Sequence, residues 1–282
     1  MAMSPRLLRP RAGGFHPEAA DWRSRVVANG GTVSTATVQA VDKFCRSIDA
    51  NGLRSLMWRV NPMAGDNLSA VLVPLYRANS ASGSVQGNTT DTNDNFVSGD
   101  YVASTGLIGN TNTKRLRTGL PLNFNATRHI GFFVHTLATV TFRTYIGGTG
   151  ATGFSGLFRL SNGSPVTNYA LAAYNEASGA GGSGGTSVHA AGDFVLGAQG
   201  DGGGTAIAYT NGVISGTSGV GRNSGTVTTG ISVFAEAQGG GTFSSHSNAR
   251  LGGYTIGDNL SESQSLAYYN IWDTLVRALG RK

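Results

Sequence analysis

The sequence is short of cysteine, of charge and of long apolar runs, and each shortage excludes a class of protein. Because Cys45 is the only cysteine among 282 residues, no disulfide can form within the chain. No run of about 18 apolar residues occurs, and residues 1–30 lack the apolar core of a signal peptide. Charged residues make up 13% and aromatic residues 9%, whereas disordered chains combine high charge with few aromatics. We therefore expect a folded protein that is made in a cytoplasm and has no membrane partner.

Glycine is abundant where cysteine and charge are scarce. It accounts for 43 of the 282 residues, and Ser, Thr and Asn are also frequent. Such residues form tight turns, and the segments between them are short and rich in β-branched and aromatic side chains. Strands are predicted at residues 96–102, 116–118, 129–137, 140–146, 156–160, 168–174, 187–198, 206–210, 230–237 and 250–256. This pattern indicates an all-β sandwich or jelly roll. The glycine turns lack the Gly-Lys-Ser/Thr ending of a phosphate loop, so no cofactor is expected.

The C-terminal stretch carries the strongest helix signal in the second half of the chain. Ser261 and Gln264 have the spacing of a capping box, and Gly280 stands where a left-handed C-terminal cap would lie. The apolar positions between them recur at helical spacing: Tyr268, Tyr269, Trp272, Leu275, Val276 and Leu279. One amphipathic helix cannot bury its own apolar stripe, so we expect the helix over 261–279 to seal the β-rich part of the chain.

Residues 21–78 are predicted to form a small helix-plus-strand segment. Ser34 has the chemistry of an N-cap and Gly52 ends the helix. The apolar face of this helix is formed by Val38, Val41, Cys45 and Ile48. Cys45 is therefore expected to act as a small buried hydrophobic residue. Residues 53–60 and the apolar run 68–76 are predicted to be strands.

Positive charge is concentrated at the N-terminus. Residues 1–60 hold nine Lys and Arg against four Asp and Glu, and the other 222 residues hold twelve against eleven. Three prolines and a Gly-Gly pair in MAMSPRLLRPRAGGFHP disfavour both a helix and a central strand. We expect residues 1–20 to be an extended basic attachment arm, with an unstructured terminus as the alternative. The candidate attachment residues are Arg6, Leu7, Leu8, Arg9, Arg11 and Phe15. No nucleic-acid-binding motif accompanies this charge, so a protein partner is favoured over nucleic acid.

The spacing of acidic residues and histidines gives little support to a catalytic or metal site. Glycoside hydrolysis needs two carboxylates a few ångströms apart, but Glu176 and Glu236 are distant in sequence, which leaves only a pair across strands. The scattered histidines, His16, His129, His135, His189 and His246, are expected in packing or surface roles. Calcium stays open as an alternative, because an oxygen-rich run contains Asn88, Asp91, Asn93, Asp94, Asn95 and Asp100. That run lacks the closing glutamate of an EF-hand, so the expectation is a protein without metal, cofactor or catalytic residues.

Several pieces of the sequence resemble one family. FVSGDYVASTGLIGNTNTKRLRTG (96–119) resembles the first-strand region of concanavalin-like, or laminin-G-like, jelly rolls in structural proteins of tailed phages and prophages. AIAYTNG (206–212), ISVFAEAQ (231–238) and the C-terminal strand, turn and helix (247–281) resemble the second half of that family. The start, MSPRLLRPRAGGF, is similar to N-termini of phage proteins that carry this module. The resemblance implies a non-enzymatic, surface-displayed structural or carbohydrate-binding protein.

The sequence therefore predicts an arm (1–20), the helix-plus-strand segment (21–78) and a concanavalin-like jelly roll (79–282). Two functions follow. In the first, the chain is a bacteriophage virion structural protein, assembled in the host cytoplasm. It would be displayed as a capsid decoration or tail-associated protein and attached to other virion proteins through its arm. In the second, the jelly roll is a tail fibre or spike lectin that binds host surface polysaccharide, with Tyr101, Tyr174 and Tyr209 as candidate loop aromatics for glycan contact. Low charge and a single cysteine also favour a homo-oligomer, by analogy with viral jelly rolls a trimer.

Overall fold

The computed structural model describes most of the chain after residue 13. The described residues are 14–77, 87–120, 122–123, 128–148, 158–163, 168–174, 181–199, 206–218, 226–227, 230–238 and 241–282. For 122–123, 158–159, 168–174, 181–187, 199, 206, 218 and 226–227 only the backbone is described.

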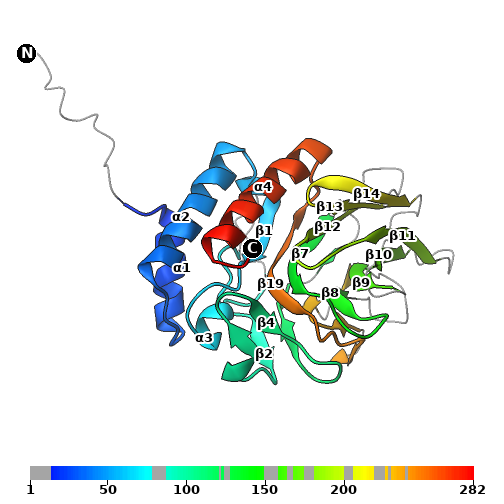
Figure 1. Cartoon of the computed structure of the whole chain (residues 1–282), viewed down its shortest axis with the longest axis horizontal. Helices are drawn as coiled ribbons and strands as arrows, with labels where there is room; N and C mark the ends of the chain where they lie inside the picture. Colours follow the sequence, from blue (N-terminus) through cyan, green and yellow to red (C-terminus); the bar gives the residue numbers. More distant parts are fainter. Residues whose placement is uncertain are drawn as a thin grey trace, which may run out of the picture.

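Two curled sheets, almost entirely antiparallel, pack face to face to form the body of the molecule (Figure 1). The described part of the first sheet has eight strands. In spatial order they are β14 (Val213–Ser218), β13 (Ala206–Thr210), β12 (Phe194–Gln199), β7 (Arg128–Thr136), β19 (Arg250–Asp258), β4 (Gly106–Ile108) and β3 (Tyr101–Val102), with β1 (Met57–Asn61) also paired to β19. In the centre of this sheet, Ile256 of β19 lies opposite Ile130 of β7.

The second sheet has nine described strands. In spatial order they are β11 (Gly181–Val188), β10 (Asn168–Tyr174), β9 (Phe158–Asn162), β8 (Thr144–Gly148), β16 (Ser232–Val233), β5 (Arg115–Arg117) and β2 (Thr92–Asp94). In addition, β17 (Glu236–Ala237) pairs with β8, and β18 (Phe243–Ser244) pairs with β17. A separate pair joins β6 (Leu122–Asn123) to β15 (Thr226–Val227).

Helices lie over the outer face of the first sheet, whose central strands are therefore buried on both sides. α4 (Glu262–Ala278) packs on the sheet, α2 (Thr35–Ala50) packs on α4, and α1 (Pro17–Ala28) packs on α2. The short helix α3 (Leu68–Val71) contacts α1. Figure 1 shows α4 over the first sheet, with α2 and then α1 farther out. Strand residues alternate between the two sides accordingly. Phe132 belongs to the core between the sheets, where its ring packs against Tyr145 with centroids 4.6 Å apart. Its neighbour Phe133 belongs to the core under the helices.

The all-β jelly-roll sandwich, with a helical segment before it and a capping helix after it, is thus confirmed. Ser261 caps α4 with the expected capping box, Gly280 has φ +69°, and Ser34 accepts a hydrogen bond from the Thr37 N–H at the start of α2. None of the helices in the described part of the chain is long and apolar enough to cross a membrane.

Several local predictions are wrong. The predicted strand 96–102 is strand only at Tyr101–Val102, and residues 140–143 of the predicted strand 140–146 are not strand. The run 68–76 is not a strand: Asn67 caps the short helix α3, and only Tyr76 bridges to Val60. The segment 187–198 is two strands, β11 and β12, separated by a turn. Helix α1 was missed, although it begins within the predicted arm with Pro17 as its first residue.

Candidate functional site

The chain enters its folded part at residues 14–16, and this entry point is tied to α2. The Arg46 side chain donates a hydrogen bond to the Gly14 carbonyl (2.8 Å), and the His16 N–H donates one to the Asp42 carboxylate. His16 also caps α1, because its Nδ1 accepts from the Glu18 N–H at 3.3 Å. Gly14 and His16 therefore tie the start of the described chain to both α1 and α2.

One face of α1 packs inward. Ala19, Trp22 and Val26 are fully buried, and Trp22 Nε1 donates to the Val73 carbonyl at 3.1 Å. The spacing of these three residues, together with Pro17 and Glu18 in the first turn, is a signal from which α1 could have been predicted.

The opposite face of α1 is exposed and apolar in part. It carries a groove of about 460 Å³, which we call the outer groove of α1, lined by Phe15, Ala20, Arg23, Ser24 and Val27. The Val27 side chain is 62% exposed and Phe15 is 36% exposed. Exposed apolar residues that form one hollow beside the entry of a basic arm are the composition expected of a protein contact.

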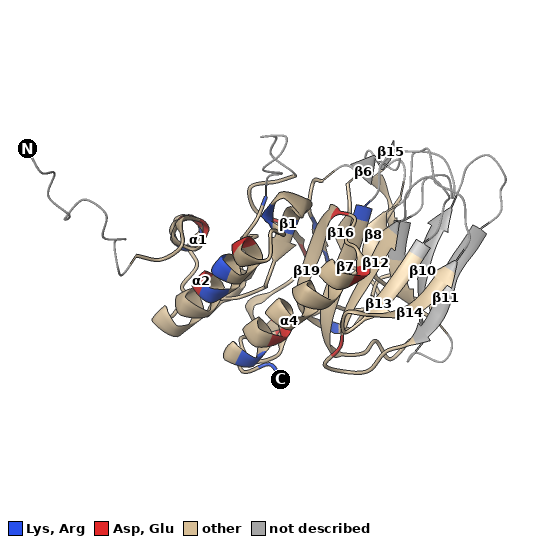
Figure 2. Ribbon diagram, turned by 90° about the horizontal axis from the view of Figure 1, so that it is seen from above, with Lys and Arg blue, Asp and Glu red and all other residues tan. Residues whose placement is uncertain are grey.

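Of the six predicted attachment residues, the structure describes one. Phe15 lines the outer groove of α1, and Arg6, Leu7, Leu8, Arg9 and Arg11 lie outside the described residues. The start of α1 and the strands β13 and β14 lie at opposite ends of the molecule in both views (Figures 1 and 2). A contact at α1 would therefore leave the far end of the sandwich accessible.

The predicted glycan-contact tyrosines do not form a surface. Tyr101 lies in β3, is 8% exposed and donates its hydroxyl hydrogen bond to the Gly65 carbonyl at 2.7 Å. Tyr209 lies in β13 and is 3% exposed, and burial raises its pKa. Placing these two rings on loops was wrong, since both belong to strands and point into the protein. The Tyr174 side chain lies outside the described residues.

A different hollow lies where the β13–β14 turn meets the start of α4. It measures about 540 Å³ and is lined by Gly212, Val213, Ser261, Glu262, Ser263 and Leu266. Val213 is 59% exposed and Leu266 is 45% exposed. This turn groove combines apolar side chains with hydroxyls and one carboxylate.

The oxygen-rich run proposed for calcium is occupied by the chain's own cations. Asp91 pairs with Arg59 (2.7 Å), Asp100 pairs with Lys114 (2.5 Å), and Asp94 pairs with Arg115 (2.7 Å) and Arg117 (2.9 Å). The asparagines of the run bond to backbone and neighbouring hydroxyls, as Asn93 does with both the N–H and the carbonyl of Phe96. These ion pairs account for the acidic side chains of the run, so their presence does not require a bound ion.

Glu236 and the histidines of the sandwich are placed in the core or near it. Glu236 is 1% exposed in β17, and Glu176 lies outside the described residues. His129 is fully buried, and the His189 ring meets Tyr145 edge-on at 5.7 Å. His246 is 8% exposed beside Arg115, and burial together with Arg115 lowers its pKa.

Sequence reasoning missed one cluster of potential metal ligands. A ligand atom of His16, one of Glu18 and Cys45 Sγ lie within 4.8 Å of one another. Because Cys45 comes 27 positions after Glu18 and stands on another helix, no sequence spacing marks the group.

No family model matches the chain, and no curated protein matches it. Among solved structures, a Trypanosoma rangeli sialidase mutant with trans-sialidase activity is 14% identical with a TM-score of 0.48, over 84% of this chain and 39% of that one. The Ruminococcus gnavus IT-sialidase CBM40 bound to alpha2,3 sialyllactose is 13% identical with a TM-score of 0.38, over 50% of this chain and 80% of that one. The HCR/D W1238A mutant is 10% identical with a TM-score of 0.39, over 58% of this chain and 41% of that one. At these scores the likenesses carry no inference about ligand or activity. The two sheets and their helical cover define the class, a jelly-roll sandwich.

Proposed function

We propose that this chain is a non-enzymatic structural protein of a bacteriophage particle, attached through its N-terminal arm and displaying the β-sandwich outward. The observation that carries the proposal is the outer groove of α1, an exposed apolar hollow immediately beside the point where the basic arm joins the fold. The virion setting rests on the sequence resemblance described above. Other virion proteins, of the capsid or the tail, are the partners of this surface.

The local structure supports such an anchoring role. The arm joins the body at Gly14, which Arg46 holds against α2. α1 and α2 share one apolar core with α4 and the outer face of the first sheet. A partner that binds the arm and the groove would therefore hold the packed part of the molecule directly, without a loose linker between them.

Attachment can be tested by incorporation of the chain into particles. The tagged full chain and its variants would be produced during particle assembly, and the particles purified by density gradient. Deletion of residues 1–13 and the substitution Val27→Asp should each abolish co-purification while leaving the circular dichroism spectrum unchanged. Val213→Asp is the matched control, because Val213 is similarly exposed at the other end of the molecule. Full incorporation of both the deletion and the Val27→Asp variant would refute the proposal.

A receptor-binding lectin is the second candidate function, and the turn groove favours it. Sugars are bound by apolar surfaces with a few converging polar groups, and Val213, Leu266, Ser261, Ser263 and Glu262 provide that combination. Saturable binding to host surface polysaccharide is expected, and Leu266→Asp should remove it whereas Val27→Asp should not. A glycan array without signal above background would count against this function.

Oligomerisation belongs to the same proposal. A displayed jelly roll with little charge would assemble as a homo-oligomer, with a trimer favoured. Sedimentation at micromolar concentration should give the mass of three chains, and the mass of one chain would contradict the trimer in solution.

A further inference from the structure

The start of α1 and the middle of α2 place three different metal-ligand side chains together. His16 caps α1, Glu18 lies in its first turn, and Cys45 is fully buried on α2. Their ligand atoms all lie within 4.8 Å of one another. A nitrogen, a carboxylate oxygen and a thiol sulfur together suit a borderline-soft divalent cation such as Zn²⁺.

The ring of His16 is already oriented for coordination. Its Nε2 lies 2.8 Å from an oxygen of Asp49, and a carboxylate can only accept, so Nε2 carries the proton. In the neutral ring Nδ1 therefore keeps its lone pair, which among the residues that the structure describes accepts from the Glu18 N–H at the long distance of 3.3 Å. A histidine that donates one nitrogen to a carboxylate and offers the other to a metal is the usual arrangement in zinc proteins.

Glu18 is held in a corresponding way. Arg54 Nε binds its Oε1 at 2.5 Å. The other oxygen, Oε2, is buried and has no hydrogen-bond partner among the residues that the structure describes. A buried carboxylate oxygen without a partner is costly, so it calls for an explanation. A cation at this position would satisfy it.

Cys45 supplies the third ligand from the opposite helix. A cation that binds here displaces the thiol proton, because the thiolate is the form of cysteine that ligates a metal. A divalent cation held by one thiolate and one carboxylate is electrically neutral overall, which suits a site at the edge of an apolar core. Glu18 lines a cleft of about 220 Å³ together with Arg54 and Tyr76, among others.

We propose that His16 Nδ1, Glu18 Oε2 and Cys45 Sγ form a zinc-type site that fastens the root of the N-terminal arm to α2. Zinc bonds of about 2.0 to 2.3 Å place tetrahedral ligands roughly 3.3 to 3.8 Å apart, so the side chains must close by at most about 1.5 Å. Asp49 and Arg54 are the positioning residues of this site.

The test uses the full chain, freed of metal with a chelator and titrated with Co²⁺ and then Zn²⁺. One equivalent of Co²⁺ should bind and give a sulfur-to-cobalt charge-transfer band in the near ultraviolet, and Zn²⁺ should displace it. Cys45→Ser should abolish the band. His16→Ser, which keeps an N-cap residue, and Glu18→Gln, which keeps an acceptor for Arg54, should each weaken binding by more than about tenfold.

Two controls keep the result decisive. His135→Asn changes a histidine outside the cluster and should leave the titration unchanged. Circular dichroism checks that each variant is folded. If Cys45→Ser does not fold, His16→Ser and Glu18→Gln still test the site. Absence of stoichiometric Co²⁺ binding, binding without a charge-transfer band, or unchanged affinity in those two variants would overturn the proposal. Particle attachment plays no part in this measurement, so its outcome is independent of the proposed function.

Discussion

At the scale of single residues, a buried ion pair connects three distant parts of the chain. The Arg59 and Asp91 side chains are both 0% exposed and approach to 2.7 Å. The Tyr254 hydroxyl donates to Asp91, and Asn61 Nδ2 donates to its second oxygen at 2.8 Å. Every oxygen of this carboxylate is thus used, which is the condition under which a buried charge is tolerated.

Removing one partner of that pair should be strongly destabilising. In Asp91→Asn the guanidinium of Arg59 stays buried without a counter-charge, and the expected loss is about 3 to 5 kcal/mol in the free energy of unfolding, measured with urea. Asp273→Asn is the control, because its partner Arg277 is 58% exposed and such surface pairs contribute about 1 kcal/mol or less. Equal losses in the two variants would contradict this account.

A second buried network fixes the protonation of His129. Its Nδ1 faces the Asp258 carbonyl at 2.5 Å and therefore donates. Its Nε2 then accepts from the Thr255 hydroxyl at 3.0 Å, and the Tyr268 hydroxyl donates to Thr255 at 2.8 Å. If Nε2 also carried a proton, that N–H and the Thr255 hydroxyl would be two donors facing each other, so the network favours the neutral ring of His129. Burial, with a smaller effect from Arg128, lowers the pKa of His129 from 6.5 to about 4.

This network makes stability depend on pH. Because the folded-state pKa is below the unfolded value of 6.5, the unfolded chain binds more protons between pH 6.5 and about pH 4. The contribution of His129 to the free energy of unfolding is fully present above pH 6.5, decreases as the pH is lowered, and is lost below about pH 4. The total loss is roughly 3 kcal/mol. Urea unfolding at pH 7 and pH 4.5 should show a smaller difference for His129→Gln than for the unmodified chain. His135→Asn should keep most of the difference, and an unchanged difference in His129→Gln would refute the assignment.

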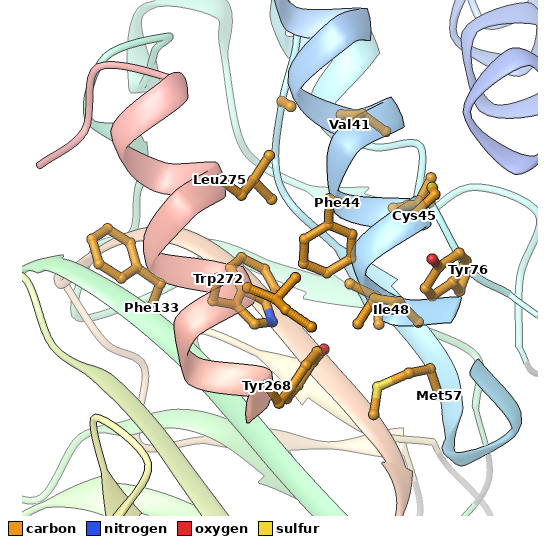
Figure 3. Close-up of a cluster of buried hydrophobic side chains, with 14 of the residues drawn as sticks. Val41, Phe44, Cys45, Ile48, Met57, Tyr76, Phe133, Tyr268, Trp272 and Leu275 are labelled. Atoms are coloured by element: carbon orange, nitrogen blue, oxygen red, sulfur yellow. The ribbon is translucent and has the colours of Figure 1, made fainter. Parts of the chain in front are cut away.

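At the scale of elements, α4 is the layer that joins α2 to the first sheet. The indole of Trp272 stacks on Phe194 of β12 at 5.4 Å and forms a T-shaped pair with Phe44 of α2 at 5.6 Å. Figure 3 shows Trp272 facing Phe44 across the two helices. The sheet makes room for it at Gly253, where an added Cβ would lie 2.6 Å from the indole.

Truncating that ring should loosen both interfaces at once. Trp272→Ala is expected to lower the free energy of unfolding by about 3 to 5 kcal/mol, as for other large core truncations. Leu266→Ala, on the same helix but 45% exposed, should cost less than about 1 kcal/mol. A loss below 1 kcal/mol for Trp272→Ala would show that α4 is not packed in this way.

The elements also show what sequence could and could not give. Caps and helical periodicity located α2 and α4, because those signals are local. The buried face of α4 was predicted less accurately. Tyr269 and Leu279, which were expected on that face, are half-buried, whereas Ile271 is buried. The reason is that α4 packs against α2 as well as against the sheet. The outer groove of α1 was not predicted because α1 itself was overlooked, although Pro17 and the spacing of Ala19, Trp22 and Val26 are local signals for that helix. By contrast, the buried state of Tyr101 and Tyr209 depends on tertiary packing rather than on local sequence.

At the scale of the whole molecule, the N-terminal segment and the sandwich share one β-sheet and one apolar core. β1 pairs with β19, and one apolar cluster runs from Trp22 of α1 to Phe133 of β7. The last turn of the chain adds to this. Arg281 is 4% exposed and donates to the carbonyls of Pro62, Met63, Ala103 and Gly252 at 2.7 to 2.9 Å.

These shared contacts predict a single unfolding transition for residues 14–282. Calorimetry of the full chain should give one peak whose calorimetric and van't Hoff enthalpies agree. A fragment of residues 79–282 should fail to fold, since it would expose the Trp272 face of α4 and leave the β1 edge of β19 unpaired. Two resolved peaks, or a stable 79–282 fragment, would instead mean that the N-terminal segment and the jelly roll fold as separate units.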